Sequence, residues 1–223
     1  MTPRGVVFDA YGTLLDVHSA MARHAGRIGP GWEALSAAWR AKQLEYSWIR
    51  SLAGPTHHRN FSDLTDAALD FVAARNGIHD LALLADLRTA YRNLNAYPEV
   101  PDMLRAIRAE GIPTAILSNG EPAMLAEGVR SAGLELLLDE VLSVESVGVF
   151  KPDPRVYKLA TDRLGSEAKD LVFVSSNAWD AFGAQANGFR VVWVNRTAQP
   201  DEYGLRNIAC ELGDLSTLAA SIT

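Results

Sequence analysis

The stretch Val6-Val7-Phe8-Asp9-Ala10-Tyr11-Gly12-Thr13-Leu14-Leu15-Asp16 decides the fold. Its first three residues are apolar and have high β-propensity, which predicts a buried parallel strand ending at Asp9. Ligands of open α/β sheets bind just beyond the carboxyl ends of the strands, so this position indicates a functional role for Asp9. The alternative is an aspartate that only caps the following turn. The segments further along the chain distinguish the two interpretations.

The composition is ordinary for a soluble globular protein, with 48% hydrophobic and 22% charged residues among 223. The net charge of −6 and the lack of a basic tract argue against a nucleic-acid partner. The single cysteine, Cys210, excludes an intrachain disulfide and a cysteine-based zinc cluster. We find neither a secretory signal nor an apolar run long enough to span a bilayer, and we expect a cytoplasmic protein without membrane association.

Residues 17–96 have the pattern of a helical insertion. Apolar residues recur at helical spacing in three segments, at residues 31–52, 64–75 and 79–94. Asn60 or Ser62 is expected to cap the second of these helices. We read the tryptophans of the first segment as packing residues.

From Pro98 onward, short β-branched runs alternate with helical segments, which is typical of a doubly wound parallel sheet. Strands are expected at residues 6–8, 114–120, 141–144, 171–175 and 190–194, the last of them being the final clear strand. Helices are expected at residues 101–110, 122–132 and 178–187 and, weakly, from residue 214. We therefore predict an α/β protein whose Rossmann-like core consists of residues 1–16 and 97–223, with residues 17–96 inserted as an all-helical cap domain.

Polar residues follow four of the predicted core segments at the point where each one ends. They are Asp9, Ser118-Asn119, Lys151 in a proline-rich loop, and Ser175-Ser176-Asn177 followed by Asp180. Each has an ordinary structural explanation, as a turn cap, a solvated lysine or an acid in the first turn of a helix. Four coincidences at one edge of a parallel sheet instead predict a convergent polar site beneath the cap.

This order of motifs resembles the haloacid dehalogenase superfamily and, more narrowly, the L-2-haloacid dehalogenases. The matching motifs are Phe8-Asp9-Ala10-Tyr11-Gly12-Thr13-Leu14, Leu117-Ser118-Asn119-Gly120, Lys151-Pro152-Asp153-Pro154, Ser175-Ser176-Asn177-Ala178-Trp179-Asp180 and, in the cap, Trp39-Arg40 and Gln43-Leu44-Glu45-Tyr46-Ser47-Trp48. The likeness covers the whole chain and implies a homodimer that uses no cofactor.

Two positions separate this group from phosphatases of the same fold. A phosphatase carries a second acid two residues after the nucleophile, where this chain has Tyr11, a poor acid at neutral pH. Ser176 stands where phosphatases carry a further metal-binding acid. Too few hard oxygen ligands then remain for Mg²⁺, so we predict no metal and expect Lys151 and Arg40 to supply the positive charge.

The resemblance implies hydrolysis of short-chain L-2-haloalkanoic acids to D-2-hydroxy acids with inversion at C2. Asp9 would attack C2 and expel the halide, and water would then hydrolyse the ester on Asp9. Lys151 would keep Asp9 ionised and oriented, while Asp180 and Asn177 would position and activate the water.

The resemblance also assigns the supporting residues. Arg40 and Asn119 are placed at the departing halide, and Ser118 with backbone groups at the substrate carboxylate. Backbone donors around Ala10 and Tyr11 would stabilise the oxyanion. Thr13, Tyr157 and Ser175 would hold Asp9, Lys151 and Asp180 in place. The apolar wall around the alkyl group would consist of Tyr11, Leu44, Phe61 and Trp179.

Two departures from the group's pattern put the preferred halogen and chain length in doubt: Ala41 follows Arg40 where a glutamine is common, and the loop of residues 54–60 is unusual. We interpret His57 and His58 in that loop as solvated residues rather than metal ligands. Arg40 has the alternative of being a surface residue paired with a neighbouring glutamate. The alternative functions are a phosphatase acting on a small phosphoester and a non-catalytic binding protein.

Overall fold

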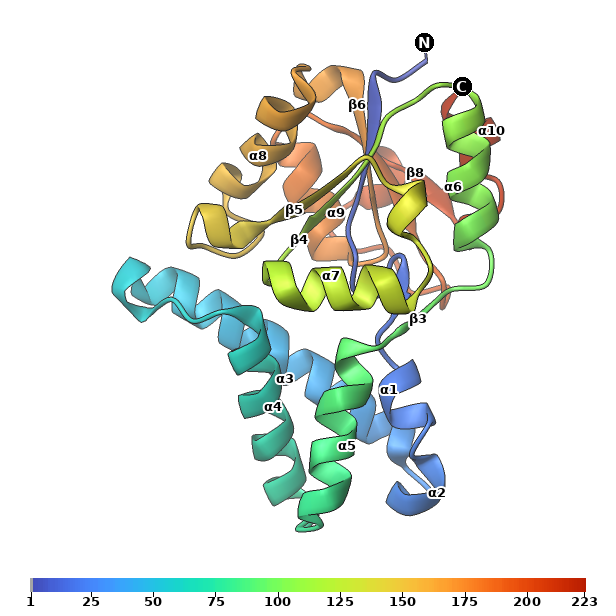
Figure 1. Ribbon diagram of the computed structural model, residues 1–223. Helices are drawn as coiled ribbons and strands as arrows, with labels where there is room; N and C mark the ends of the chain where they lie inside the picture. Colours follow the sequence, from blue (N-terminus) through green and yellow to red (C-terminus); the bar gives the residue numbers. More distant parts are fainter. Residues whose placement is uncertain (1) are drawn as a thin grey trace.

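A six-stranded parallel sheet with the strand order β5-β4-β1-β6-β7-β8 forms the centre of the computed structural model, which describes residues 2–223 (Figure 1). The strands are β1 (Gly5–Phe8), β4 (Thr114–Ser118), β5 (Glu140–Ser143), β6 (Leu171–Ser175), β7 (Arg190–Val194) and β8 (Cys210–Leu212). Every residue of β1 is buried, because β1 pairs with β4 on one side and β6 on the other. This explains its uninterrupted apolar sequence and confirms the predicted parallel α/β fold.

Helices from the segments between the strands, and one after the last strand, flank the sheet. They are α6 (Val100–Ala109), α7 (Pro122–Ser131), α8 (Pro154–Leu164), α9 (Ala178–Ala186) and α10 (Leu218–Ile222). Helices α6, α7 and α8 each carry a proline in the first turn, where its missing N–H costs no helical hydrogen bond. Helix α9 packs against β6 and β7 and thereby covers the strands that lead into the predicted site.

A second group of helices lies beyond the carboxyl end of β1, in the lower half of Figure 1. It contains α1 (Ser19–Ala22), α2 (Ala25–Ile28), α3 (Trp32–Ala53), α4 (Phe61–Arg75) and α5 (Leu81–Arg92). The cap of α4 is Asn60, whose side chain accepts a hydrogen bond from the N–H of Asp63 at 2.8 Å. The structure thus selects Asn60 over Ser62, and the division into a core of residues 1–16 and 97–223 and a cap of residues 17–96 stays a prediction.

Two short strands join the helical group to the sheet. β2 (Leu15–Asp16) and β3 (Asn95–Ala96) pair in antiparallel fashion, and the N–H of Tyr97 donates to the carbonyl of Leu14 at 3.0 Å. The two connections between the halves of the molecule therefore run side by side. The sequence pattern indicated neither strand, because two residues carry no detectable alternation.

The structure corrects several other boundaries. A further strand, β8, follows β7, which we had taken as the last clear strand, and α10 begins at Leu218 rather than at residue 214. Helices α1 and α2 were not predicted. The remaining helical turns are η1 (Pro55–His57), η2 (Glu135–Leu137), η3 (Val144–Ser146), η4 (Ala168–Asp170) and η5 (Leu205–Asn207). Short edge elements such as β8 are stabilised by pairing with β7 rather than by their own pattern. Among residues 2–223, we find no helix that is both long and apolar enough to cross a membrane.

Candidate active site

Asp9 lies directly after β1, where its N–H donates to the carbonyl of Val174 on β6 at 3.0 Å. The chain then turns at Gly12, whose φ of +90° is a conformation that favours glycine. Asp9 is only 5% exposed, so its carboxylate depends on protein donors in place of water. One oxygen, Oδ2, accepts from Thr13 Oγ1 at 3.1 Å and from Asn177 Nδ2 at 2.7 Å.

Lys151 connects the two buried carboxylates of the site. Its Nζ lies 3.2 Å from Oδ1 of Asp9 and 2.8 Å from Oδ2 of Asp180, and its side chain is 1% exposed. The backbone N–H of Lys151 donates to Oδ1 of Asn119 at 3.0 Å, which links the loop before α8 to the end of β4. A buried ammonium between two carboxylates satisfies the requirement that a buried charge be paired.

Asp180 lies in the first turn of α9 and is completely buried. Tyr157 Oη donates to its Oδ1 at 2.7 Å, and Ser175 Oγ donates to its Oδ2 at 3.3 Å. Burial raises the pKa of Asp180 to about 6, and the nearby Lys151 ammonium limits this increase. Tyr157 therefore contacts Asp180 and acts on Lys151 only through that carboxylate.

The predicted residues after β4 and β6 lie at the same edge of the sheet as Asp9, and each of them has its own hydrogen-bond partners. Asn177 Nδ2 also lies 3.2 Å from the carbonyl oxygen of Tyr11. Ser118 Oγ is buried and accepts from the N–H of Gly120 at 3.1 Å. The N–H of Ser176 donates to Thr13 Oγ1 at 2.9 Å, whereas the buried Oγ of Ser176 has no hydrogen-bond partner within residues 2–223.

Arg40 reaches this edge from α3 in the helical group. Its Nη2 donates to the carbonyl of Tyr11 at 3.2 Å, and its Nη1 donates to Oε1 of Gln43 at 2.7 Å. Arg40 is thus not a surface residue paired with a glutamate. The guanidinium thus contacts the backbone two residues after the nucleophile candidate Asp9, and its acceptors there are neutral oxygens.

Aromatic rings surround the predicted alkyl pocket. The Tyr11 ring lies 5.8 Å from that of Phe61 and 6.0 Å from that of Tyr91, and Phe61 lies 5.9 Å from Phe150. The Tyr11 hydroxyl is buried and finds no hydrogen-bond partner in the described part of the chain, and burial raises the pKa of Tyr11 well above its usual value. Trp179, in contrast, packs edge-on against Trp48 of α3 at 5.4 Å. Leu44 and Ala10 are also buried.

The sequence missed several residues that the structure places at the site. Gln43 and Tyr91 contact each other and lie beside Arg40, although neither has a predicted role. His58 is a correction, because it is half-buried and paired: its Nε2 lies 3.1 Å from Glu145 Oε2 and its ring 5.0 Å from that of Phe150. Nothing in the sequence relates residues 58 and 145, whereas Gln43 lies three residues after Arg40, on the same helical face.

Within residues 2–223, no three carboxylate, histidine or cysteine side chains gather in a way that suits a metal ion. The carboxylates of the site are Asp9 and Asp180, and the Lys151 ammonium lies between them. Besides Lys151, the two carboxylates accept from three hydroxyls, those of Thr13, Tyr157 and Ser175, and from the Asn177 amide.

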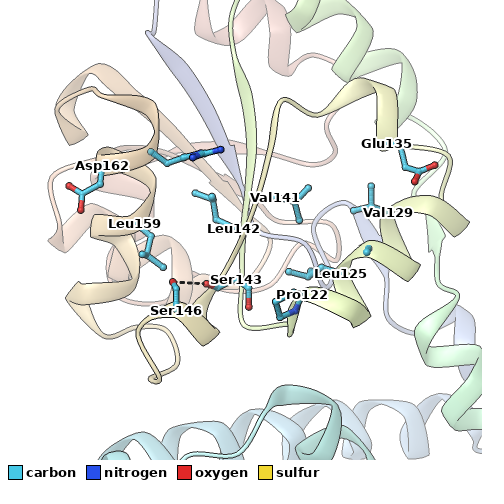
Figure 2. A pocket seen from close by; sticks show the side chains of 12 residues that line it. Pro122, Leu125, Val129, Glu135, Val141, Leu142, Ser143, Ser146, Leu159 and Asp162 are labelled. Carbon is cyan, nitrogen blue, oxygen red and sulfur yellow. Dashed lines mark hydrogen bonds between the residues drawn. The ribbon is translucent and has the colours of Figure 1, made fainter.

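A separate apolar groove lies beside the edge strand β5, between α7 and α8 (Figure 2). It has a volume of about 770 Å³, and its lining includes Leu125, Val129, Val141 and Leu159. None of the predicted catalytic residues lines it. We therefore assign the chemistry to the buried edge beneath α3 and not to this open groove.

Comparisons with known proteins agree with this geometry. Residues 3–188 match a family model described as haloacid dehalogenase-like hydrolase. The chain is 44% identical over 216 residues to (S)-2-haloacid dehalogenase 4A of Burkholderia cepacia, covering 96% of this chain and 93% of that protein. It is 46% identical over 216 residues to (S)-2-haloacid dehalogenase 1 of Pseudomonas sp. (strain CBS-3), covering 96% and 94%.

A solved structure of the L-2-haloacid dehalogenase from Xanthobacter autotrophicus, which holds covalently bound chloropropionic acid, is also similar. Its TM-score is 0.85, its sequence identity is 33%, and the match covers 99% of this chain and 98% of that one.

Proposed function

This chain belongs to the haloacid dehalogenase-like hydrolases, and we propose that it hydrolyses short-chain L-2-haloalkanoic acids to D-2-hydroxy acids through an ester on Asp9. It is a hydrolase of carbon–halogen bonds, like its relatives at 44% and 46% identity. The observation that carries the proposed mechanism is the pairing of Asp9 with Lys151, which presents an ionised carboxylate in a buried site.

In the first step, Asp9 attacks C2 of the substrate. Its Oδ2 already accepts two hydrogen bonds, from Thr13 and Asn177, whereas Oδ1 accepts one, from Lys151. Oδ1 therefore has the lone pair that is free for attack. The new C–O bond forms as the C–halogen bond breaks, and approach from behind that bond inverts C2.

The protein stabilises negative charge both on the departing halide and on the substrate carboxylate. The halide leaves as an anion, and we assign its binding to the Arg40 guanidinium together with Asn119. Ser118 and neighbouring backbone N–H groups are assigned to the substrate carboxylate. Tyr11, Leu44, Phe61 and Trp179 would enclose the alkyl group.

In the second step, water attacks the carbonyl carbon of the Asp9 ester. Asp180 accepts the proton of this water, which requires its ionised form. Asn177 keeps the ester group in place, and the backbone N–H groups of Ala10 and Tyr11 stabilise the oxyanion. The bond between the Asp9 carbonyl carbon and the ester oxygen then breaks, and the departing alkoxide takes the proton from Asp180. The C2–O bond stays intact, so the inverted configuration is retained in the hydroxy acid and Asp9 is regenerated.

Access to the site implies movement of the helical group. Asp9 and Lys151 are almost fully enclosed, while Arg40 is carried by α3 of the group we assign to the cap, residues 17–96. Opening would admit the substrate, and closure would bring Arg40 to the halide and exclude water. A homodimer in the cytoplasm remains our prediction for the assembly and location.

The experiment that tests this function is halide release from L- and D-2-chloropropionate in excess EDTA. We expect release from the L form alone, because Asp9 attacks from one fixed side and Lys151 replaces a metal as the source of positive charge. Asp9→Asn is the matched control, since it keeps the shape of the side chain but lacks the nucleophile, and it should release no halide.

Two results would contradict the proposal. No halide from either enantiomer, with Mg²⁺-dependent phosphate release from a generic phosphoester, would make the chain a phosphatase. Halide release that stops in EDTA would show that a metal is required.

A further inference from the structure

Gln43 is a buried amide whose polar atoms are all engaged near the site. It is 0% exposed, and its Nε2 donates to Thr65 Oγ1 on α4 at 2.5 Å. Its Oε1 accepts from Tyr91 Oη on α5 at 3.0 Å and from Arg40 Nη1 at 2.7 Å. One side chain on α3 is therefore fixed by the two other long helices of the group, and it in turn holds Arg40.

The second feature is the absence of a counterion. Within residues 2–223, the hydrogen-bond partners of Arg40 are neutral: the amide oxygen of Gln43, the backbone carbonyl of Tyr11 and the adjacent Tyr91 hydroxyl. A neutral acceptor orients a guanidinium through the hydrogen bond and leaves its charge available to an anion. A carboxylate at the same place would orient it equally well but would neutralise it.

We propose that Gln43 is a positioning residue that holds the Arg40 guanidinium as an oriented, uncompensated cation for the departing halide. This inference rests on the proposed function, in which Arg40 assists only the first step. It predicts that a defect at Gln43 slows ester formation and weakens halide binding, while hydrolysis of the Asp9 ester keeps its rate.

A purely structural role for Gln43 predicts a different outcome. A buried amide that only bonds Thr65 and Tyr91 contributes to stability, and its loss removes one hydrogen bond from each of those hydroxyls. Such a loss lowers stability and affects both chemical steps alike. Whether ester formation alone or both chemical steps are slowed therefore distinguishes a positioning role of Gln43 from a purely structural one.

The test compares Gln43→Glu and Gln43→Met with the wild-type protein. Gln43→Glu is almost the same shape and still accepts from Arg40, but it places a negative charge against the guanidinium. Gln43→Met is of similar length and neutral, and it removes the acceptor. Ser47→Ala is the matched control: Ser47 is also 0% exposed on α3, and its hydroxyl only donates to Leu44 of the same helix at 2.8 Å.

Ester formation is measured with excess enzyme and L-2-chloropropionate by rapid quenching and intact-protein mass spectrometry, and halide binding is measured as inhibition by bromide. For Gln43→Glu we expect ester formation to slow about 100-fold, the effect typical of losing one preorganised electrostatic group. We expect Gln43→Met to slow it about tenfold, bromide inhibition to weaken in both, and Ser47→Ala to be unchanged.

The proposal is overturned if Gln43→Met is as slow as Gln43→Glu, if the ester accumulates in either variant because its hydrolysis is slowed, or if bromide inhibition is unchanged. Should Gln43→Glu fail to fold, an unchanged rate of ester formation in Gln43→Met would overturn it. If the wild-type protein releases no halide, the proposed function fails, which is a separate result.

Discussion

The Lys151 ammonium lies within hydrogen-bond distance of Asp9 at 3.2 Å and of Asp180 at 2.8 Å. The two carboxylates differ in their surroundings. Asp9 is 5% exposed and accepts from Thr13 and Asn177. Asp180 is completely buried and accepts from Tyr157 and Ser175. Burial raises the pKa of Asp180 to about 6, which suits a group that accepts a proton near neutral pH. In the proposed mechanism, these environments separate the nucleophile Asp9 from the base Asp180.

The pH dependence of ester hydrolysis follows from Asp180. Only the ionised carboxylate accepts a proton, so the hydrolysis rate should fall about tenfold per pH unit below a pKa of about 6. The Tyr157 hydroxyl donates to Oδ1 of Asp180 and favours the ionised form. Tyr157→Phe should therefore raise the pKa and move the acidic limb to higher pH. Single-turnover hydrolysis rates from pH 4 to 9 measure this shift.

An unmoved acidic limb in Tyr157→Phe would mean that Asp180 is not the base.

The raised pKa of Asp180 in the wild-type protein also affects the stability of the fold. Because the folded protein holds the Asp180 proton up to about pH 6 and an unfolded aspartate only to about 3.8, this group favours folding most at low pH. Its contribution is lost as the pH rises through this interval.

At the scale of elements, the close approach of α9 to α8 positions Asp180. Gly183 on α9 has no room for a side chain, because an added Cβ would meet the Tyr157 hydroxyl and lie 2.9 Å from Cβ of Pro152. The same helix carries Asp180 in its first turn. The contact between the two helices and the hydrogen bond from Tyr157 to Asp180, the proposed base, are therefore coupled.

We expect Gly183→Ala to destabilise the fold by about 1–3 kcal/mol, as overpacking does, and to displace Tyr157 from Asp180. Urea unfolding measures the first effect and the pH profile the second. Gly26→Ala is the control, since an added Cβ at this exposed position on α2 meets nothing within 4 Å. A Gly183→Ala protein as stable as wild type would show that the helices separate without cost.

At the scale of the whole molecule, Arg196 connects the sheet to both connections of the helical group. It lies after β7, and its Nη2 donates to the carbonyl of Thr13 at 2.9 Å. Its Nη1 pairs with Glu99 at 2.7 Å, and its guanidinium carbon lies 3.6 Å from the centre of the Tyr97 ring. Since Thr13 also binds Asp9, one arginine joins these two connections, which would act as the hinge of the proposed cap movement, to the proposed nucleophile.

Arg196→Met should lower stability by about 1–3 kcal/mol, because it leaves the Thr13 carbonyl and the Glu99 carboxylate without their charged donor. It should also lower the rate of halide release, since Thr13 loses its support. Thermal unfolding and halide assays measure these effects. The control is Arg155→Met, which removes an exposed pair with Asp153 and should leave both unchanged. Equal behaviour of the two variants would contradict a role of Arg196 at the hinge.

Much of this fold is predictable from the sequence because its strands are buried on both faces. The apolar runs that become β1, β4, β6 and β7 are continuous, and polar residues mark their ends. The short pieces β2, β3 and β8 escaped prediction, because their stability comes from pairing partners elsewhere in the chain.

The sequence by itself determined the parallel α/β sheet, the position of Asp9 at the end of β1, and the membership of Lys151, Asn177 and Asp180 in one edge. These follow from local pattern, since the carboxyl ends of parallel strands meet at the same side. Only the tertiary structure decided which side chains meet across the fold. It placed Gln43 between Arg40, Thr65 and Tyr91, and it paired His58 with Glu145. The contacts between elements join residues up to 87 positions apart and form only once the chain has folded, because buried polar atoms then need partners, so no local pattern encodes them.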